Sequence, residues 1–261
     1  MGPVDQWAAD LAAWAIPQAI VDAAPESPWF HDPAAFAVND TLVRDSVSAV
    51  MAREALSPSG TVLDVGVGGG RASLALTPEV RRIIGVDSNA HMLASFRQAA
   101  ASLGVPALGV LGPWPEVALE VEAANIVVCH HVLYNVGDIA PFIRALTNHA
   151  IERVVVEITT THPTSAMNAA WSHFHGLMRP TSPTWREAVE VCSALGLDVE
   201  AQVSPSTATR ATVPSSVAFV RRRLCLPESR DAELAEWLAA HPMPSSGEVA
   251  TLWWPGAARV R

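Results

Sequence analysis

Short apolar segments rich in β-branched residues recur along the chain and predict the strands of a sheet. The first five are residues 61–65, 82–86, 105–111, 125–129 and 154–158. The first, Thr-Val-Leu-Asp-Val, is mostly apolar, which is typical of a parallel strand buried on both faces. The residues that follow such strands gather at one edge of a sheet, so we look there for functional side chains.

Segments with helical periodicity or a recognisable cap separate and flank these strands. The predicted helices are residues 5–24 with a break at Pro17, 39–56, 89–103, 184–195 and 231–240. Asp40 is a suitable N-cap for the second of them, and Gly104 ends the third.

A glycine-rich turn, Gly66-Val-Gly-Gly-Gly70, follows the first strand, and a helix is predicted from Arg71. A strand, a glycine turn and a helix N-terminus together form a cradle for a polar cofactor. The strict dinucleotide spacing fails because Arg71 stands where its third glycine would fall. A phosphate-binding Walker loop is also excluded, since the chain contains no lysine.

Two acidic residues accompany this turn. Asp87 follows the second strand, where a carboxylate can accept both hydroxyl protons of a ribose. Asp64 lies inside the motif, where its carboxylate can help to hold the turn and attract a cationic ligand.

Four segments in this order resemble the class I S-adenosylmethionine (SAM) dependent methyltransferases. They are Val62–Gly70, Gly85–Met92, Ala124–Tyr134 and Arg153–Ile158. The resemblance spans about residues 45 to 223 and implies a Rossmann-like α/β fold. The implied sheet is seven-stranded and mainly parallel, with an antiparallel C-terminal strand.

The resemblance also implies a division of the chain. We expect an N-terminal helical cap or lid at 1–44, a SAM-binding core at 45–226 with a substrate-side insertion at 159–183, and a C-terminal helix and edge extension at 227–261. Within it, residues 197–203 and 216–222 are predicted as the terminal antiparallel pair, and 248–255 as an added edge strand. The lid candidates are Trp29, Phe30 and His31, although a hydrophobic plug for the N-terminal helices is an alternative.

The cofactor implied by the resemblance is S-adenosyl-L-methionine, with S-adenosyl-L-homocysteine as product. The cofactor-binding residues expected are Asp64, Gly66, Gly68, Gly70, Asp87, Ser88, Met92, Gly112, Trp114, Cys129 and His130. The loop after the third strand lacks the acid that many relatives use for the adenine amine. Adenine recognition would then depend on the backbone around Gly112 and on Trp114, unless this Trp is structural.

The catalytic candidates His130, His131 and Tyr134 follow the fourth strand. A hydroxyl acceptor must lose a proton during methyl transfer, and histidine suits that role near neutral pH. We expect His131 on the substrate side and His130 beside the cofactor, with Tyr134 contacting the acceptor. The alternative for each is a packed side chain with satisfied hydrogen bonds.

A metal site was weighed as another use of this region. His130, His131, Glu157 and His162 would converge if the fourth and fifth strands are neighbours. The spacing matches no metal motif, and Mg²⁺ prefers carboxylate and amide oxygens. We therefore predict no metal.

Composition limits the partners and the location. The net charge of −9 and the pI of about 5.4 argue against a nucleic-acid substrate. The three cysteines form no CxxC motif, which suits a reducing cytoplasm. No segment is expected to span a membrane, and no secretory signal is expected at the N-terminus.

The predicted function is SAM-dependent O-methylation of a small hydroxylated molecule. Three segments resemble an actinobacterial subgroup that is similar to the sugar 1-O-methyltransferase of mycobacterial methylmannose polysaccharide synthesis; they are Pro25–Trp29, Cys129–Asn135 and Phe174–Pro180. Aromatic and polar residues from Trp171 to Arg179 would also suit a carbohydrate ring. The alternatives are N- or C-methylation of a small molecule, or an inactive SAM-binding regulatory protein, and a homodimer is one option for assembly.

Overall fold

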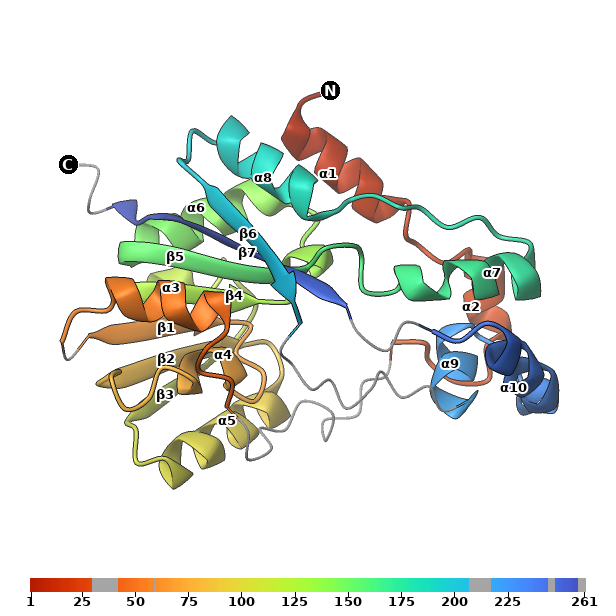
Figure 1. The fold of residues 1–261 in the computed structure, drawn as a ribbon, viewed down its shortest axis with the longest axis horizontal. Coiled ribbons are helices and arrows are strands. Elements are labelled where there is room, and N and C mark those ends of the chain that lie inside the picture. The colour runs from red at the N-terminus through yellow and green to blue at the C-terminus, as the bar shows by residue number, and fades with distance from the viewer. Residues whose placement is uncertain (30–41, 59, 207–216, 244–246, 258–261) are drawn as a thin grey trace.

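The computed structural model describes residues 1–29, 42–58, 60–206, 217–243 and 247–257. Its centre is a seven-stranded sheet in the order β3-β2-β1-β4-β5-β7-β6 (Figure 1). The strands are β1 (Thr61–Val65), β2 (Arg82–Asp87), β3 (Ala107–Leu111), β4 (Ala124–His130), β5 (Ala150–Thr159), β6 (Glu200–Pro205) and β7 (Glu248–Pro255). Among the described strands, β7 alone runs opposite to the other six, so the predicted Rossmann-like fold with a mainly parallel sheet is confirmed.

The C-terminal end of the sheet differs from the prediction in two ways. Residues 216–222 were expected to be a strand, but Val217–Arg223 form helix α9. Residues 248–255, expected at the sheet edge, lie between β5 and β6 and are mostly buried. A short apolar run is compatible with either element, and here helix formation lets Val220 and Leu224 share one buried cluster.

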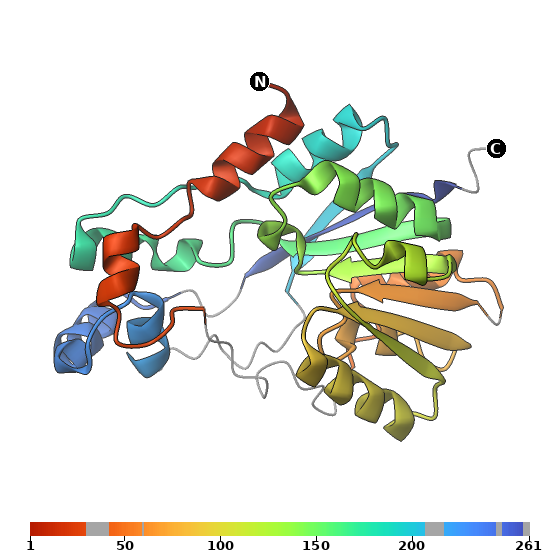
Figure 2. The ribbon, with the colours of Figure 1, turned by 180° about the vertical axis from the view of Figure 1, so that it is seen from behind.

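Two layers of helices cover the faces of the sheet (Figures 1 and 2). On one face lie α1 (Pro3–Ala12), α6 (Ile139–His149) and α8 (Trp185–Ala194). On the other lie α3 (Val47–Ala55), α4 (Arg71–Leu74) and α5 (Ala90–Ser102). Each face has its own hydrophobic cluster, because the strands carry apolar side chains on both faces.

Helix α3 begins later than predicted. Its N-cap is Ser46, whose side chain accepts a hydrogen bond from the Ala49 N–H at 3.2 Å. The predicted cap, Asp40, lies outside the described residues, as do the lid candidates Phe30 and His31. Helix α5 agrees closely with the prediction, because Asn89 caps its start and Gly104 follows its end with a φ of 68°.

A small bundle of helices, which we call the cap bundle, lies on the side of the sheet where β5 ends (Figure 1). It consists of α2 (Gln18–Ala23), α7 (Asn168–His175), α9 and α10 (Asp231–Ala240), which share a third hydrophobic cluster. The bundle thus combines both ends of the chain with the insertion after β5. The N-terminal segment is divided, since Trp7 of α1 is buried against the sheet.

Short 3₁₀ turns complete the secondary structure. They are η2 (Ala118–Glu120), η3 (Leu133–Asn135), η4 (Ser165–Met167) and η5 (Glu228–Arg230). In the part of the chain that the structure describes, no helix combines the length and the apolar character needed to cross a membrane.

Candidate functional site

The candidate functional residues lie where β1, β2 and β4 end. β1 pairs in parallel with β2 on one side and with β4 on the other. The glycine turn, Asp87 and His130 therefore reach the same edge of the sheet. This carboxyl edge is where open α/β sheets bind their ligands.

The glycine turn after β1 is shaped by three residues with positive φ: 74° at Gly66, 51° at Gly68 and 90° at Gly70. A Cβ on Gly66 would lie 2.3 Å from Val132, and one on Gly70 would lie 2.6 Å from Phe96. A Cβ on Gly68 would meet no atom of the described residues within 4 Å. Gly66 and Gly70 therefore serve close packing, whereas Gly68 borders open space that a ligand can enter.

Asp87 is fixed beside this open space. Its Oδ2 accepts a hydrogen bond from the Gly68 N–H at 2.9 Å, and its Oδ1 accepts one from the Asn89 N–H at 2.8 Å. Ser88 follows at an exposed position, and Met92 is buried in α5. The carboxylate is thus held at the tip of β2 by backbone groups, as a ribose contact requires.

Asp64 of β1 is hydrogen-bonded to helix α4. Its side chain is 1 % exposed and accepts hydrogen bonds from the hydroxyl of Ser73 at 2.6 Å and from its N–H at 3.3 Å. Burial raises its pKa from 3.8 to about 7, against the effect of the Ser73 hydrogen bonds. Asp64 therefore joins β1 to α4, which agrees with the predicted role of holding the turn.

The residues expected near adenine are occupied by internal contacts. Trp114 is buried and packs edge-on against His149, with 4.9 Å between ring centroids. The Gly112 N–H donates to the carbonyl of Asp87 at 3.0 Å. Cys129 is fully buried, and burial raises the pKa of its thiol well above the usual range.

His131 has an unusual backbone conformation. Its φ is 60°, in the left-handed region that few residues other than glycine adopt. The His131 N–H donates to the carbonyl of Glu157 at 2.7 Å, and the ring Nε2 lies 3.4 Å from Glu157 Oε1. The side chain is 38 % exposed. The turn therefore aims a half-exposed imidazole at a carboxylate on the neighbouring strand.

Glu157 is ionised in this setting. Burial alone would raise its pKa, but the neighbouring His130 and the hydrogen bonds from His131 and Ser48 outweigh it and lower the pKa to about 2. The Ser48 hydroxyl donates to Oε2 at 2.6 Å. The hydrogen bond from Ser48 was not predicted. The sequence did suggest that Glu157 and His131 would converge, but only as part of a metal site, and the direct pair of the two side chains was not proposed.

The charge of Glu157 determines the tautomer of His131. An ionised carboxylate only accepts hydrogen bonds, so we assign the ring proton to Nε2, the nitrogen that faces it. Nδ1 then has a free lone pair. Such an imidazole can take up a proton at Nδ1 while the carboxylate stabilises the charge that results.

His130 differs from its neighbour in burial. The two rings are nearly perpendicular, with centroids 6.5 Å apart. Burial lowers the pKa of His130, and its Nε2 is enclosed without a hydrogen-bond partner in the part of the chain that the structure describes. A neutral ring with an unpaired nitrogen fits the predicted place beside the cofactor.

Tyr134 has the contacts of the alternative considered for it, a packed side chain with a satisfied hydroxyl. It is 6 % exposed, stacks on Trp7 at 5.9 Å, and donates its hydroxyl proton to the Thr159 carbonyl at 2.8 Å. Burial raises its pKa. Its hydroxyl is therefore engaged inside the protein and is not presented to an acceptor.

His162, weighed above as a metal ligand, stacks on Trp14 with centroids 3.8 Å apart. Burial and the charge of Arg179 lower its pKa to about 4. Among the described residues, no three His, Cys, Asp or Glu side chains are grouped so that they can hold a metal ion.

The aromatic insertion after β5 also has internal partners. Trp171 and Phe174 are buried in the cap bundle, and His175 Nε2 bonds the Leu224 carbonyl at 2.6 Å. Arg179 donates to the carbonyls of Trp14 and Ala15. The large aromatic side chains Trp171 and Phe174 are therefore part of the core of the cap bundle. Of the lid candidates, Trp29 is described, and it is 57 % exposed.

Comparison with known proteins gives a family match over the part of the chain that contains most of this site. Residues 63–154 match the family described as a methyltransferase domain, and this range includes the glycine turn, Asp87 and both histidines. This segment is therefore similar to SAM-dependent methyltransferase domains. SAM is thus its cofactor, and the open space at Gly68, the fixed Asp87 and the unpaired His130 nitrogen fit that ligand.

Solved structures share the fold of this chain at low identity. YcgJ from Bacillus subtilis is 17 % identical, with a TM-score of 0.52 over 80 % of this chain and 97 % of its own. The magnesium protoporphyrin IX methyltransferase of Synechocystis PCC 6803, solved with bound S-adenosylhomocysteine, is 15 % identical, with a TM-score of 0.51 over 80 % of each chain. The precorrin-6y C5,15-methyltransferase of Geobacter metallireducens GS-15 is 15 % identical, with a TM-score of 0.50 over 85 % and 94 %. No curated protein matches the sequence.

Proposed function

We propose that this methyltransferase transfers a methyl group to a hydroxyl of a small molecule, with His131 as the general base. The observation that carries the proposal is the pair of His131 Nε2 and the ionised Glu157 at the end of β4. A base near neutral pH is needed for a hydroxyl acceptor, because an alcohol that keeps its proton is a poor nucleophile.

The cofactor side of the site would be formed by the glycine turn and the two strand ends beside it. Asp87 would accept hydrogen bonds from the ribose hydroxyls, and the backbone at Gly68 would allow the ligand to approach closely. His130 would face the cofactor as a neutral ring. SAM held there supplies a methyl group already activated by a sulfonium.

The remaining chemical task for the chain is to remove the proton of the acceptor hydroxyl. Nδ1 of His131 would take this proton as the oxygen attacks, and Glu157 would stabilise the imidazolium that forms. A base positioned in this way contributes about two to four orders of magnitude in rate. Holding the acceptor oxygen in line with the bond from sulfur to the methyl group supplies much of the remaining rate enhancement.

The acceptor class is a small hydroxylated molecule. The prediction of a sugar relied partly on the aromatic residues of the insertion, but Trp171 and Phe174 are buried in the cap bundle. The faces of these two rings are therefore covered by other residues. A sugar remains one member of the proposed acceptor class, supported by the sequence resemblance alone.

The proposal is tested with labelled SAM and matched acceptor panels. The protein is incubated with methyl-labelled SAM and with sugars, phenols and hydroxy acids, and the same scaffolds carrying amines form the control panel. Methyl ethers found by mass spectrometry only with the hydroxylated panel are the expected result. Methylation of the amines alone would replace the proposal with N-methylation. Tight SAM binding without any labelled product would indicate a regulatory SAM-binding protein.

A further inference from the structure

Ser48 and Glu157 are separated by 109 residues in sequence, but their side chains meet at 2.6 Å. Ser48 lies in the first turn of α3 and is 2 % exposed. Helix α3 packs on β5, the strand that carries Glu157. The hydroxyl therefore reaches the carboxylate from the layer of helices that covers this face of the sheet.

The direction of each hydrogen bond can be deduced. Ionised Glu157 only accepts, so the single hydroxyl proton of Ser48 points to Oε2. The Ser46 oxygen lies 3.2 Å from the Ser48 oxygen, and Ser46 must be the donor in that contact. Ser46 also caps α3 by accepting the Ala49 N–H. A directed chain thus runs from the start of α3 to Glu157.

The two oxygens of Glu157 consequently have different partners. Oε2 is occupied by Ser48, and Oε1 faces Nε2 of His131 at 3.4 Å. A carboxylate free to rotate about its last bond would offer His131 a varying partner, whereas one held at Oε2 presents Oε1 in a fixed direction. Hydrogen bonds from a hydroxyl to a carboxylate are among the stronger ones in proteins.

We propose that Ser48 is a positioning residue, which holds Glu157 so that His131 keeps its proton on Nε2 and presents Nδ1 to the acceptor. The inference rests on the proposed role of His131 as base. Ser48 does not touch the reacting atoms, and its effect passes through Glu157. The start of α3 thereby becomes part of the catalytic arrangement.

The test measures the imidazole N–H proton of His131 by ¹H NMR in water, with the full-length protein and without any acceptor. Its resonance is assigned by its loss in His131→Ala. We expect a slowly exchanging downfield signal in the wild type, broadened by faster exchange in Ser48→Ala and restored in Ser48→Thr, which keeps the hydroxyl. Thr251→Val is the matched control, because Thr251 is a buried residue paired with Glu157 across the sheet and its hydroxyl has no hydrogen-bond partner among the described residues.

Activity provides a second readout. With an acceptor from the product screen, Ser48→Ala should lower kcat about tenfold, a part of the contribution of the base, and leave SAM affinity unchanged. An unchanged His131 signal in Ser48→Ala would overturn the inference while leaving the base intact. Absence of the signal in the wild type would instead show that His131 does not form a stable pair with Glu157, and this would contradict the proposed mechanism as well. A signal that responds to Ser48 while His131→Ala keeps full kcat would support the positioning contact and refute the base.

Discussion

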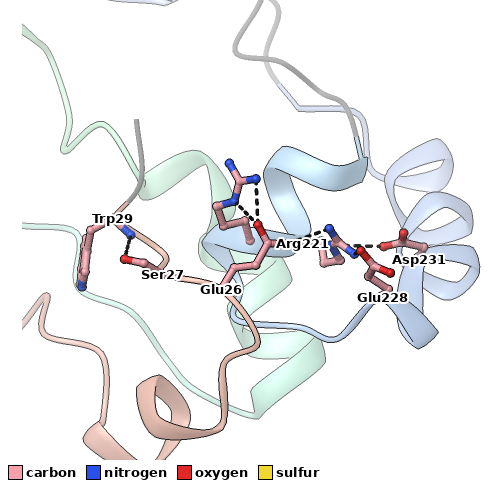
Figure 3. Close-up of polar contacts among 7 residues, drawn as sticks. Glu26, Ser27, Trp29, Arg221, Glu228 and Asp231 are labelled. Carbon is pink, nitrogen blue, oxygen red and sulfur yellow. Dashed lines mark hydrogen bonds and ion pairs between the residues drawn. The ribbon is translucent and has the colours of Figure 1, made fainter. Parts of the chain in front are cut away.

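Glu26 and Arg221 stand 195 residues apart in sequence, and their side chains form an ion pair at 3.0 Å (Figure 3). The Arg221 side chain is 8 % exposed and also pairs with Glu228 at 3.0 Å and with Asp231 at 3.7 Å. The other oxygen of Glu26 accepts from Arg222 at 2.9 Å. These contacts fasten the segment after α2 to α9 and α10, so that the cap bundle depends on residues from both ends of the chain.

Replacing Arg221 should loosen the cap bundle. Arg221→Met removes the cation that joins three carboxylates from different segments, so the network that connects these segments loses its common partner. We expect the melting temperature to fall by roughly 5 °C. Limited proteolysis should cut first at the ends of the chain.

The matched control for this change is Arg82→Met. Arg82 pairs with Glu122 at 3.3 Å on the exposed surface, where an ion pair contributes little. Equal melting temperatures for the Arg221 and Arg82 variants would show that the network does not hold the bundle together.

Asp64 should make stability fall as the pH rises. Its pKa is raised by burial from 3.8 to about 7 in the folded protein, so the folded state binds its proton more tightly than the unfolded state does. The stabilisation is fully present below about pH 4 and is lost as the pH rises to about 7, with a total change of up to about 4 kcal/mol. Asp64→Asn has no carboxyl proton at this position, so its stability should lack this pH dependence.

Urea unfolding at several pH values measures this effect. The stability of the wild type relative to Asp64→Asn should decline between about pH 4 and pH 7 and then level off. Parallel curves for the two proteins would mean that Asp64 is not held in its protonated form by burial.

Much of the sheet could be predicted because its determinants are local. The strand at 61–65 and the helix over 89–103 were predicted almost to the residue, since Asn89 and Gly104 mark the two helix ends directly in the sequence. Residues 217–223 are different, because a short apolar run fits a strand as well as a helix. The position of β7 between β5 and β6 depends on contacts distant in sequence, and no local pattern reports them.

The candidate site divides in the same way. The glycine turn and Asp87 belong to one strand-turn-helix unit and its neighbour, so their meeting follows from the parallel pairing of β1 with β2. The contact of Ser48 with Glu157 joins α3 to β5 and depends on how the helix packs. Burial also depends on contacts distant in sequence. The sequence alone therefore could not show whether Tyr134 faces the acceptor or, as in the structure, lies in the core.

His131 should be required for turnover but not for cofactor binding. His131→Ala removes the proposed base, so kcat should fall by about two to four orders of magnitude. SAM affinity, measured by calorimetry, should stay close to that of the wild type because the glycine turn and Asp87 are untouched. Glu157→Gln should give a smaller loss, since the ring remains and only its charge partner is gone.

The control for these two variants is His241→Ala. His241 stacks on Trp237 at the end of α10 in the cap bundle, and the loss of this contact should leave kcat unchanged. A His131→Ala protein with normal kcat would make His131 structural and direct the search for a base to His130 or to the insertion after β5.

Gly68 offers the sharpest test of where the cofactor lies, because Gly104 provides a matched partner. Both residues have positive φ, 51° and 68°, and a Cβ on either would meet no atom of the described chain within 4 Å. Alanine at each position should therefore cost about 1 kcal/mol of stability through the left-handed backbone alone.

Gly104 ends α5 away from the glycine turn, whereas Gly68 borders the proposed cofactor space and donates its N–H to Asp87. Gly68→Ala should lower SAM affinity at least about tenfold, because the methyl group fills space that the ligand needs. Gly104→Ala should bind SAM as the wild type does. If calorimetry finds the two variants equal in affinity, the cofactor does not approach the backbone at Gly68, and the glycine turn shapes the protein without holding the ligand there.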